Sequence, residues 1–534
     1  MFIGSELWKS RVPFELVQEK LPSGKIIETF PGLPKSLYEA VSIHAERIPD
    51  KLAVEDDFGH GFTYGELKEA VDRFAAVLKY RFKVKRGDHV ALMMYCSGEF
   101  CVAFLALSKL GAVAVMLPTK YRKKEICALV DRADLTHVIC DTDYNSYFAA
   151  YRDKGITFLE YHSSKERFAF DELFPSDDQE TDAEGEKEDI AVMMFTSGTT
   201  SLSKGVMLTN YSYLHAAAVY QKIFSVTEAD SAVIPVPIYM ITGLSALLGL
   251  MLFSGGTLYL QQFFHAKDVL RCIQEKGVTV LHAAPTVYSL FLAEKEEFPA
   301  LESLRLLACG GGKTTRQMEQ RIHAWLPQVS FRTVYGMTET ASPAAILPES
   351  AEISPEPESD GLPIPGMQFQ IVDENGKELP PGQIGEILMR GTNLLQEYYK
   401  VDTPAYRGGW LHTGDMGYLT EDGYCYVADR IKDMINRGGE KIISSDVEKE
   451  LLEEADVEEA AVVGIPHEVY GEVPAAVVKL REGGLRTEES LRADLKERMA
   501  GYKVPVKILF VEKIPLTPNG KYDKKYMKTL FKDK

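Results

Sequence analysis

The alternation of short apolar strands with helices constrains the fold of this chain more than any other feature. The run VALMMY at Val90–Tyr95 is typical of a strand, and Gly98–Leu110 predicts a helix that ends at Gly111. The runs AVAVML and THVICD follow as strands, with a helix near 123–131 between them. Strands and helices that alternate at this spacing form parallel sheets covered by helices. The sequence therefore predicts an α/β fold.

Composition excludes several classes of protein. The 534 residues predict roughly two to four domains, and 60 basic against 78 acidic side chains give a net charge of −18. Such acidity disfavours nucleic acid and anionic membranes as partners, since both attract basic surfaces. The first twenty or so residues lack a signal-peptide pattern. Seven scattered cysteines without a CxxC pair indicate free thiols in a reducing cytoplasm rather than a zinc site.

One segment resembles a membrane span. Residues 231–266 contain no Asp, Glu, Lys or Arg. Pro235, Pro237 and the break at Ser254–Gly256 leave no uninterrupted apolar run of about 20 residues, the length that a transmembrane helix requires. A buried helix followed by a buried strand at Thr257–Leu260 is the better prediction, and no transmembrane segment is expected.

The segment Met193–Asn210 reads MMFTSGTTSLSKGVMLTN and can bind an anion. Short hydroxylated side chains and glycine leave backbone N–H groups available to an anion, and a lysine nearby adds a positive charge. An ordinary loop has a similar composition, so the segment alone is not specific. The residues that would bind the anion are Thr196, Ser197, Gly198, Thr199, Thr200 and Lys204.

A second glycine-rich run, LRLLACGGGKTT at 304–315, looks like the end of a P-loop. That motif requires glycine five residues before Gly312, and position 307 is leucine, which argues against a P-loop NTPase. Gly310, Gly311 and Gly312 follow an apolar strand and still indicate close approach of the backbone to something. Either a tight turn or a flat ligand ring would explain them.

The pattern of elements changes near Lys432. Short helices and strands then form a compact α+β unit that ends in PLTPNGKYDKK, where Lys521 follows a Pro-Asn-Gly turn. Alone, such a lysine is more often a solvated surface charge. We therefore expect a large domain over 1–431, built of layered α/β subdomains plus a small β unit, and a small mobile C-terminal domain over 432–534.

Seven motifs occur in a characteristic order along the chain: TSGTT-x-x-x-KG, the triple glycine, YGMTET, TGD, DR-x-KD, GGE and PNGK. Together they make the chain resemble, from about Pro34 to Lys521, the adenylate-forming (AMP-binding) superfamily. Its members include acyl-CoA synthetases, peptide-synthetase adenylation domains and luciferases. The resemblance implies an enzyme that uses ATP, Mg²⁺ and coenzyme A. A carboxylate attacks the α-phosphorus of ATP, pyrophosphate leaves, and a thiol then displaces AMP from the acyl-AMP.

The resemblance also implies a role for each motif. The first motif, with Lys204, would hold the β- and γ-phosphates, Thr338 would contact the α-phosphate, and Glu339 would hold Mg²⁺. Asp415 would accept the ribose hydroxyls, and Arg430 would also reach the ribose or phosphate side. The residues that would frame the adenine and its neighbourhood are Gly310, Gly311, Gly312, Tyr335, Gly336 and Met337. The residues counted as catalytic are Lys521, Thr338, Glu339 and Lys204.

A change of conformation follows from the same resemblance. Lys521 would bridge the attacking carboxylate and the α-phosphate during adenylation. Rotation at the hinge residue Lys432 would then withdraw Lys521 and bring in the loop Gly438, Gly439 and Glu440, which would open a tunnel for the pantetheine thiol.

Four departures from the family pattern stand out. Ser201–Ser203 replaces Gly-Leu-Pro in the first motif, and Met240 replaces a usual histidine. Tyr239, Met240 and Gly243 would border the acyl pocket, so methionine there favours an apolar or bulky acid. Ala428 and Ser444 replace a common glycine and a common proline, and the sequence alone indicates no consequence of either.

Three functions are compatible with these sequence features. The preferred one is an AMP-forming acid–CoA ligase acting on a hydrophobic carboxylic acid, fatty, aromatic or similar. An acyl-AMP ligase that loads the phosphopantetheine of a separate carrier protein is the alternative. A non-enzymatic sensor is disfavoured because Lys521, Glu339 and Asp415 are all present. The acid, the thiol acceptor and the oligomeric state stay open.

Overall fold

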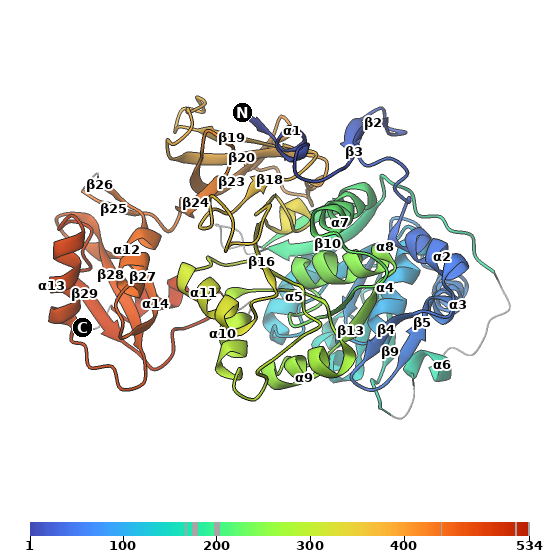
Figure 1. Cartoon of the computed structure of the whole chain (residues 1–534). Coiled ribbons are helices and arrows are strands. Elements are labelled where there is room, and N and C mark those ends of the chain that lie inside the picture. Colours follow the sequence, from blue (N-terminus) through green and yellow to red (C-terminus); the bar gives the residue numbers. More distant parts are fainter. Residues whose placement is uncertain (166–167, 174–179, 197–202, 439, 518–520, 532–534) are drawn as a thin grey trace. The chain divides into compact units, whose positions relative to one another are not determined.

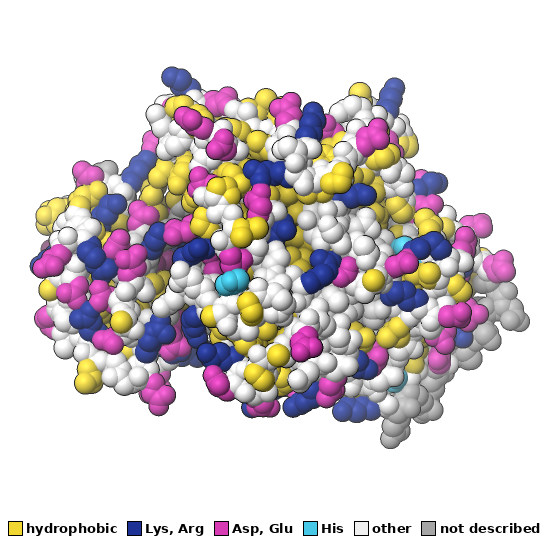
Figure 2. All heavy atoms as spheres, in the orientation of Figure 1, with side chains coloured by type: hydrophobic (Ala, Val, Ile, Leu, Met, Phe, Trp, Pro, Cys, Tyr) yellow, Lys and Arg dark blue, Asp and Glu magenta, His cyan; other side chains and the backbone are white. Residues whose placement is uncertain are grey.

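The protein is described here by a computed structural model that covers residues 1–165, 168–173, 180–196, 203–438, 440–517 and 521–531. It divides into two compact units (Figure 1). Unit 1 comprises Met1–Phe369 and Met389–Leu411, and unit 2 comprises Gln370–Leu388 and His412–Lys534. Among the described residues, no helix has the length and apolarity needed to cross a bilayer. On the face seen in Figure 2, acidic and basic side chains are interspersed.

Unit 1 contains a seven-stranded sheet whose centre is parallel. Strands β6, β7, β8 and β9 pair in parallel with one another or with β10, while β10–β11 and β11–β21 are antiparallel. In sheet order the strands are β21 (Glu397–Tyr398), β11 (Lys204–Thr209), β10 (Ile190–Thr196), β7 (Val113–Met116), β6 (His89–Met93), β8 (His137–Asp141) and β9 (Thr157–Tyr161). This sheet confirms the predicted alternation.

A nine-stranded sheet forms the rest of the α/β framework of unit 1. Its six central strands are parallel, and both edges are antiparallel. In sheet order they are β18 (Leu362–Pro363), β17 (Ala345–Ile346), β16 (Ser330–Tyr335), β15 (Leu306–Gly310), β14 (Val280–Ala283), β12 (Ser231–Val233), β13 (Thr257–Leu260), β4 (Leu52–Asp56) and β5 (Gly61–Thr63).

Helices connect and cover these strands. They are α2 (Leu37–Arg47), α3 (Tyr64–Ala76), α4 (Gly98–Leu110), α5 (Lys123–Ala133), α7 (Asn210–Phe224), α9 (Ala266–Lys276), α10 (Pro285–Ala293) and α11 (Arg316–Trp325). Every residue of α4 is buried, and its end at Gly111 has a φ of 66°. A left-handed residue of this kind commonly ends a helix, and glycine adopts it without strain. The helix predicted over Gly98–Leu110 is therefore confirmed at both ends.

The apolar segment at 231–266 is folded into the core of unit 1. A π-helix, η4 (Thr242–Gly249), runs into α8 (Leu250–Ser254), and Gly255 with a φ of 77° ends it before β13. A Cβ at Gly249 would lie 2.7 Å from the hydroxyl of Tyr213, so α7 packs closely against this helix. The predicted buried helix and strand are confirmed.

Unit 2 ends in a five-stranded sheet packed against three helices (Figure 1, red). The strands are β25 (Ile435–Arg437), β26 (Glu440–Ile442), β27 (Val457–His467), β28 (Gly471–Leu480) and β29 (Lys507–Phe510), and the helices are α12 (Ser444–Leu452), α13 (Glu488–Arg498) and α14 (Lys524–Thr529). Alternate residues of β27 face opposite cores: Val462 packs with α12 and α13, and Val463 packs with Met527 of α14.

Three strands run from one unit into the other: β19 (Met367–Val372), β20 (Gly385–Gly391) and β23 (Trp410–Leu419). Within unit 2, β23 pairs antiparallel with β24 (Cys425–Arg430). The boundary predicted at 431/432 lies inside unit 2. A hinge is a property of motion, so a single arrangement does not test it and the boundary stays a prediction.

The remaining elements are short. They are β1 (Phe2–Ile3), α1 (Gly4–Trp8), β2 (Val17–Lys20), β3 (Ile26–Thr29), η1 (Val77–Arg81), η2 (Thr142–Tyr147), η3 (Ala149–Tyr151), α6 (Ala169–Leu173), η5 (Thr338–Thr340) and β22 (Tyr406–Arg407).

Candidate active site

The predicted phosphate-binding loop lies at the tip of the β10–β11 hairpin in unit 1. Thr196 and Lys204 form the last residue pair of that hairpin. Between them, Ser197, Gly198, Thr199 and Thr200 lie outside the described residues. A Cβ at Gly205 would lie 3.3 Å from both Met193 and Tyr399, so the strand after the loop is closely packed. The hairpin therefore gives the loop a rigid base.

Glu339, the predicted magnesium ligand, joins this hairpin to two other segments. The Thr196 hydroxyl donates to its Oε1 over 3.5 Å, and the Tyr398 hydroxyl donates to the same atom over 3.1 Å. The backbone N–H of Leu395 donates to the Glu339 carbonyl oxygen over 2.7 Å. Burial, reinforced by the Glu339 carboxylate, raises the pKa of Tyr398 far above its usual value, so this hydroxyl stays a donor.

The ammonium group of Lys204 lies on the other side of the same tyrosine. Its Nζ is 4.9 Å from the centre of the Tyr398 ring and 3.3 Å from the Thr403 hydroxyl. The ring face attracts the cation, and the hydroxyl of that ring holds the carboxylate of Glu339. Tyr398 thus positions both charged groups that the sequence predicts to meet the phosphates and Mg²⁺.

The segment after Tyr335 is held in a strained conformation. A Cβ at Gly336 would lie 1.6 Å from the Ser342 carbonyl oxygen, so only glycine fits there. Ala341 and Ser342 have φ values of 52° and 101°, which cost L-residues about 1–3 kcal/mol each. Such strain persists only where surrounding contacts hold it, and it is common at active sites.

Contacts from three elements hold this strained segment, which includes Met337 and Thr338. The Tyr220 hydroxyl lies 2.9 Å from Ser342 Oγ, and the Ser245 hydroxyl donates to the Ala341 carbonyl over 2.8 Å. The Asn393 amide donates over 2.7 Å to the carbonyl oxygens of Thr340 and Pro343. The protein's own contacts therefore hold the backbone that follows Thr338 and Glu339.

The three glycines at the end of β15 have different reasons to be glycine. A Cβ at Gly310 would lie 2.7 Å from the Val334 carbonyl oxygen, and Gly311 has a φ of 79°. At Gly312, by contrast, the nearest atoms to a Cβ are 3.4 Å away in Pro285. Packing alone therefore does not require glycine at 312, which favours the explanation that a flat ligand approaches the backbone there.

The predicted acyl-pocket residues lie at the start of η4. Tyr239 is buried, and that burial raises the pKa of its hydroxyl, while Met240 is half-buried. A Cβ at Gly243 would lie 2.8 Å from the Pro237 carbonyl oxygen, so this glycine allows the turn to close. The local backbone thus explains why residue 243 is glycine, without a role in substrate contact.

In unit 2, the structure brings Asp415 and Arg430 together. They are paired residues of β23 and β24, and Arg430 Nε lies 3.0 Å from Asp415 Oδ1. The Asp415 side chain is 4% exposed, whereas that of Arg430 is 44% exposed. The guanidinium therefore orients a buried carboxylate, the group that the sequence predicts to accept the ribose hydroxyls.

The other predicted residues of unit 2 lie on or next to turns, except that Glu440 begins a strand. Lys432 is exposed, Gly438 has a φ of 60°, and Glu440 begins β26 opposite Arg437, while Gly439 lies outside the described residues. Lys521 is exposed, and its backbone closes a turn with Thr517 by bonds of 2.7 and 3.2 Å. The predicted residues thus form two groups, one in each unit.

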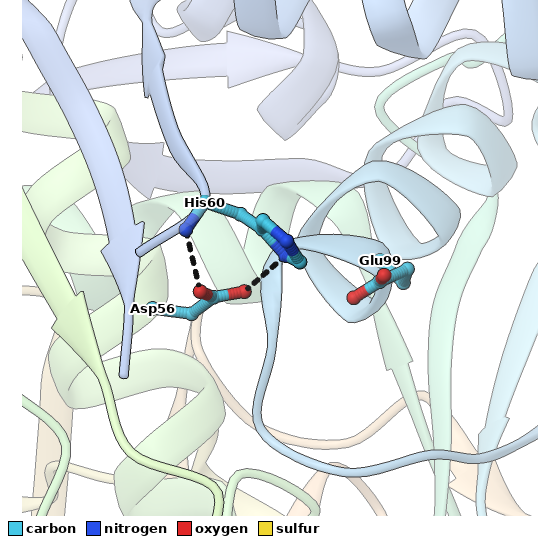
Figure 3. A group of neighbouring side chains, drawn as sticks. All are labelled: Asp56, His60 and Glu99. Atoms are coloured by element: carbon cyan, nitrogen blue, oxygen red, sulfur yellow. Dashed lines mark hydrogen bonds and ion pairs between the residues drawn. The ribbon is translucent and has the colours of Figure 1, made fainter. Parts of the chain in front are cut away.

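A polar cluster in unit 1 lies outside all seven motifs. Asp56, His60 and Glu99 offer ligand atoms within 4.8 Å of one another, and the Glu99 carboxylate points toward His60 (Figure 3). However, Asp56 already accepts three backbone N–H groups, from Phe58, His60 and Gly98. Burial raises the pKa of Glu99, which favours its neutral form. We interpret the cluster as a contact that fastens β4 to the start of α4.

Sequence reasoning missed Tyr398 and Thr403. Both lie outside every motif. Only their contacts with Glu339 and Lys204 in the structure reveal them. His282 was also missed: it is buried beside Gly310, and burial lowers its pKa to about 3. No spacing in the sequence indicates these partners, because they come from distant strands.

Comparison with known proteins identifies the family. Residues 41–399 match the model of the AMP-binding enzyme, and residues 446–521 match the AMP-binding enzyme C-terminal domain. The chain belongs to the AMP-binding enzyme family. The resemblance and the fold class predicted from the sequence are confirmed.

Two curated relatives of this AMP-binding enzyme are CoA ligases. It is 32% identical to the 2-succinylbenzoate–CoA ligase of Geobacillus kaustophilus, over 90% of this chain and 95% of that protein. It is 31% identical to a feruloyl-CoA synthase from Amycolatopsis, over 87% of this chain and 92% of that protein.

The fold of this chain also matches the folds of solved structures. ATP-bound MatB from Rhodopseudomonas palustris aligns with a TM-score of 0.85 at 28% identity, covering 93% of this chain and 99% of that one. The o-succinylbenzoate CoA synthetase (MenE) of Bacillus subtilis, in complex with ATP and magnesium ion, aligns with a TM-score of 0.80 at 29% identity, covering 92% and 99%. The same synthetase in complex with its acyl-adenylate intermediate also aligns with a TM-score of 0.80.

Proposed function

We propose that this AMP-binding enzyme is an AMP-forming acid–CoA ligase. It activates a carboxylic acid with ATP, releases pyrophosphate, and transfers the acyl group from AMP to the thiol of coenzyme A. The observation that carries the proposal is the cluster in which Tyr398 holds Glu339 on its hydroxyl and Lys204 on its ring. Relatives that match nearly the whole chain and are themselves acid–CoA ligases support it.

The first step joins two anions, so the chain must offset their repulsion. Lys204 and the loop Thr196–Thr200 would hold the β- and γ-phosphates, and Thr338 would contact the α-phosphate. Mg²⁺, when bound, neutralises phosphate charge and stabilises the pyrophosphate that leaves. The Glu339 carboxylate fits a magnesium ligand, because the hydroxyls of Thr196 and Tyr398, its hydrogen-bond donors among the described residues, are neutral.

The nucleoside would be held by residues of both glycine-rich and acidic motifs. Gly310, Gly311, Gly312 and Tyr335 would frame adenine, and Gly336 and Met337 would belong to the same nucleotide site. Asp415 would accept the ribose hydroxyls while Arg430 keeps its carboxylate oriented. These roles rest on the motif match together with the geometry within each unit.

We assign the second step to the domain over 432–534. Lys521 would bridge the carboxylate and the α-phosphate in the first step. Rotation at Lys432 would then exchange Lys521 for the loop Gly438, Gly439 and Glu440, which would line the path of the thiol. In that step the sulfur bonds to the acyl carbon, and the bond from that carbon to the phosphate oxygen breaks to release AMP.

We propose a hydrophobic acid as the substrate. Tyr239 and Met240 offer an aromatic and a flexible apolar surface at the start of η4. The relatives are named for chemically different acids, so relationship alone does not select one. Free cysteines, all seven of them described, are consistent with action in the cytoplasm, which we propose as the location.

A purified-enzyme assay tests the function. The protein is incubated with ATP, Mg²⁺ and coenzyme A, with 2-succinylbenzoate, ferulate, oxalate and fatty acids of several chain lengths offered singly. The expected result is AMP, pyrophosphate and one acyl-CoA thioester. Failure of every acid to yield AMP would contradict the proposal. Acyl-AMP that reacts with a phosphopantetheinylated carrier protein and not with coenzyme A would replace it by the carrier-loading alternative.

A further inference from the structure

A set of polar contacts centred on the buried Ser444 lies beside the predicted hinge, and the two-step chemistry does not use it. We call it the hinge clasp: Asp429, Ser444, Glu448 and Lys524. The backbone N–H and the hydroxyl of Ser444 donate to the same Asp429 oxygen over 2.6 and 2.7 Å. Lys524 Nζ donates to the Ser444 hydroxyl oxygen over 2.6 Å and lies 2.9 Å from Glu448.

The clasp is charged and at least half-buried. Ser444 is fully buried, and the Lys524 side chain is 19% exposed. Burial alone would lower the pKa of Lys524, but the Glu448 and Asp429 carboxylates outweigh it and raise that pKa. Lys524 therefore stays charged at neutral pH. Hydrogen bonds that involve a charged partner are shorter and about twice as strong as neutral ones, and burial strengthens them further.

The members of the clasp come from opposite sides of Lys432. Asp429 belongs to β24, where it pairs with Met416 of β23. Ser444 begins α12, and Lys524 begins α14, three residues after Lys521. Ser445 adds a second contact between α12 and β24, because its hydroxyl donates to the Ala428 carbonyl oxygen.

We propose that the hinge clasp stabilises one arrangement of the hinge and so sets the balance between the two half-reactions. Rotation at Lys432 moves α12 and α14 relative to β24, which separates Ser444 from Asp429. Ser444 makes the clasp possible, since a proline there has neither an N–H nor a hydroxyl to donate. Ser444 and Lys524 are thus positioning residues, and this role rests on the proposed function.

A series of substitutions at Ser444 removes the hydrogen-bond donors of the clasp in steps. Ser444→Thr keeps both donors, Ser444→Ala keeps only the N–H, and Ser444→Pro removes both. Ser490→Ala is the matched control, since Ser490 also makes hydrogen bonds at a helix start in unit 2, with Thr487. The unfolding temperature of each variant is also measured, and it distinguishes an effect on stability from an effect on the hinge.

Two half-reactions are measured for each variant: acyl-AMP formation from acid and ATP, and thioester formation from supplied acyl-AMP and coenzyme A. We expect Ser444→Pro to change the ratio of the two rates roughly tenfold, Ser444→Ala by less, and Ser444→Thr and Ser490→Ala by less than about twofold. Equal changes in both rates, or a constant ratio across the series, would overturn the clasp.

A measurement that needs no activity distinguishes failure of the clasp from failure of the proposed function. Arg430 and Lys432 are exposed and are trypsin sites. We expect cleavage after them to be several-fold faster in Ser444→Pro than in the wild type and unchanged in Ser490→Ala. Equal cleavage rates would refute the clasp, even in an enzyme that forms acyl-CoA. A faster rate supports it, even if no acid tested is a substrate.

Discussion

At the scale of single residues, Tyr398 links two opposite charges without contributing a charge itself. Its ring lies under the Lys204 ammonium and its hydroxyl binds Glu339. Phenylalanine removes the hydroxyl and keeps the ring, so the contact with Glu339 can be measured apart from the contact with Lys204.

We predict that Tyr398→Phe weakens the magnesium-dependent step. The ring that faces Lys204 remains, but Glu339 loses a donor and its carboxylate becomes less well oriented. Acyl-AMP formation should fall roughly tenfold and require more Mg²⁺ for half-maximal rate. A magnesium titration of the rate checks this. Tyr399→Phe is the control, because the Tyr399 hydroxyl binds exposed Asp134 instead, and an equal loss in both variants would argue against the assignment.

Two glycines should respond differently to the same substitution. Gly336→Ala places a methyl group 1.6 Å from a backbone oxygen, so we expect a loss of more than about 3 kcal/mol in the free energy of unfolding. Gly312→Ala meets its nearest atoms at 3.4 Å, so unfolding should change by less than about 1 kcal/mol while ATP binding weakens. Urea unfolding and ATP titration check both. Unchanged ATP binding in Gly312→Ala would contradict the assignment of Gly312 to the adenine site.

At the scale of elements, α7 carries a histidine that joins two other segments. His215 lies 3.0 Å from the Thr29 hydroxyl of β3 and 3.0 Å from the Pro365 carbonyl oxygen. Burial lowers the pKa of His215 to about 4 from its ordinary 6.5, so the folded protein holds this imidazole neutral.

Because the pKa of His215 is lower in the folded state, the unfolded state binds its proton first as pH falls. Stability should therefore fall between about pH 6.5 and pH 4, by up to about 1.4 kcal/mol per pH unit from this group. His215→Asn should flatten that slope, and urea unfolding at several pH values measures it. The exposed His265→Asn is the control. A slope that His215→Asn leaves unchanged would contradict this account.

The elements themselves were largely predictable, but the contacts of the site were not. The helix Gly98–Leu110 and the strand Thr257–Leu260 follow from local patterns that the final fold keeps. The partnership of Glu339 with Tyr398 spans 59 residues and depends on how β21 pairs with β11. Ser444 was visible as a departure from the family, but its consequence required the position of Asp429. The acid is unpredictable for the same reason, since a pocket wall is made by distant segments.

At the scale of the whole molecule, the predicted phosphate-binding and acyl residues belong to unit 1, while Asp415 and Lys521 belong to unit 2. We predict that Lys521→Ala abolishes acyl-AMP formation and leaves thioester formation from supplied acyl-AMP within about threefold of the wild type. Loss of the cation at the reacting carboxylate affects only the first step.

Assays of the two half-reactions check this prediction. Lys525→Ala removes another exposed lysine of the same segment and should affect neither step. Equal losses in both half-reactions of Lys521→Ala would contradict an alternating mechanism.

The contacts of Lys204 also bear on the reversibility of catalysis. Its described partners, a ring face and a hydroxyl, are neutral. An incoming polyphosphate therefore displaces weak dipolar partners instead of competing with a carboxylate for the cation. The same holds for pyrophosphate after the first step, so added pyrophosphate should find this cation open to it and should drive acyl-AMP back to ATP.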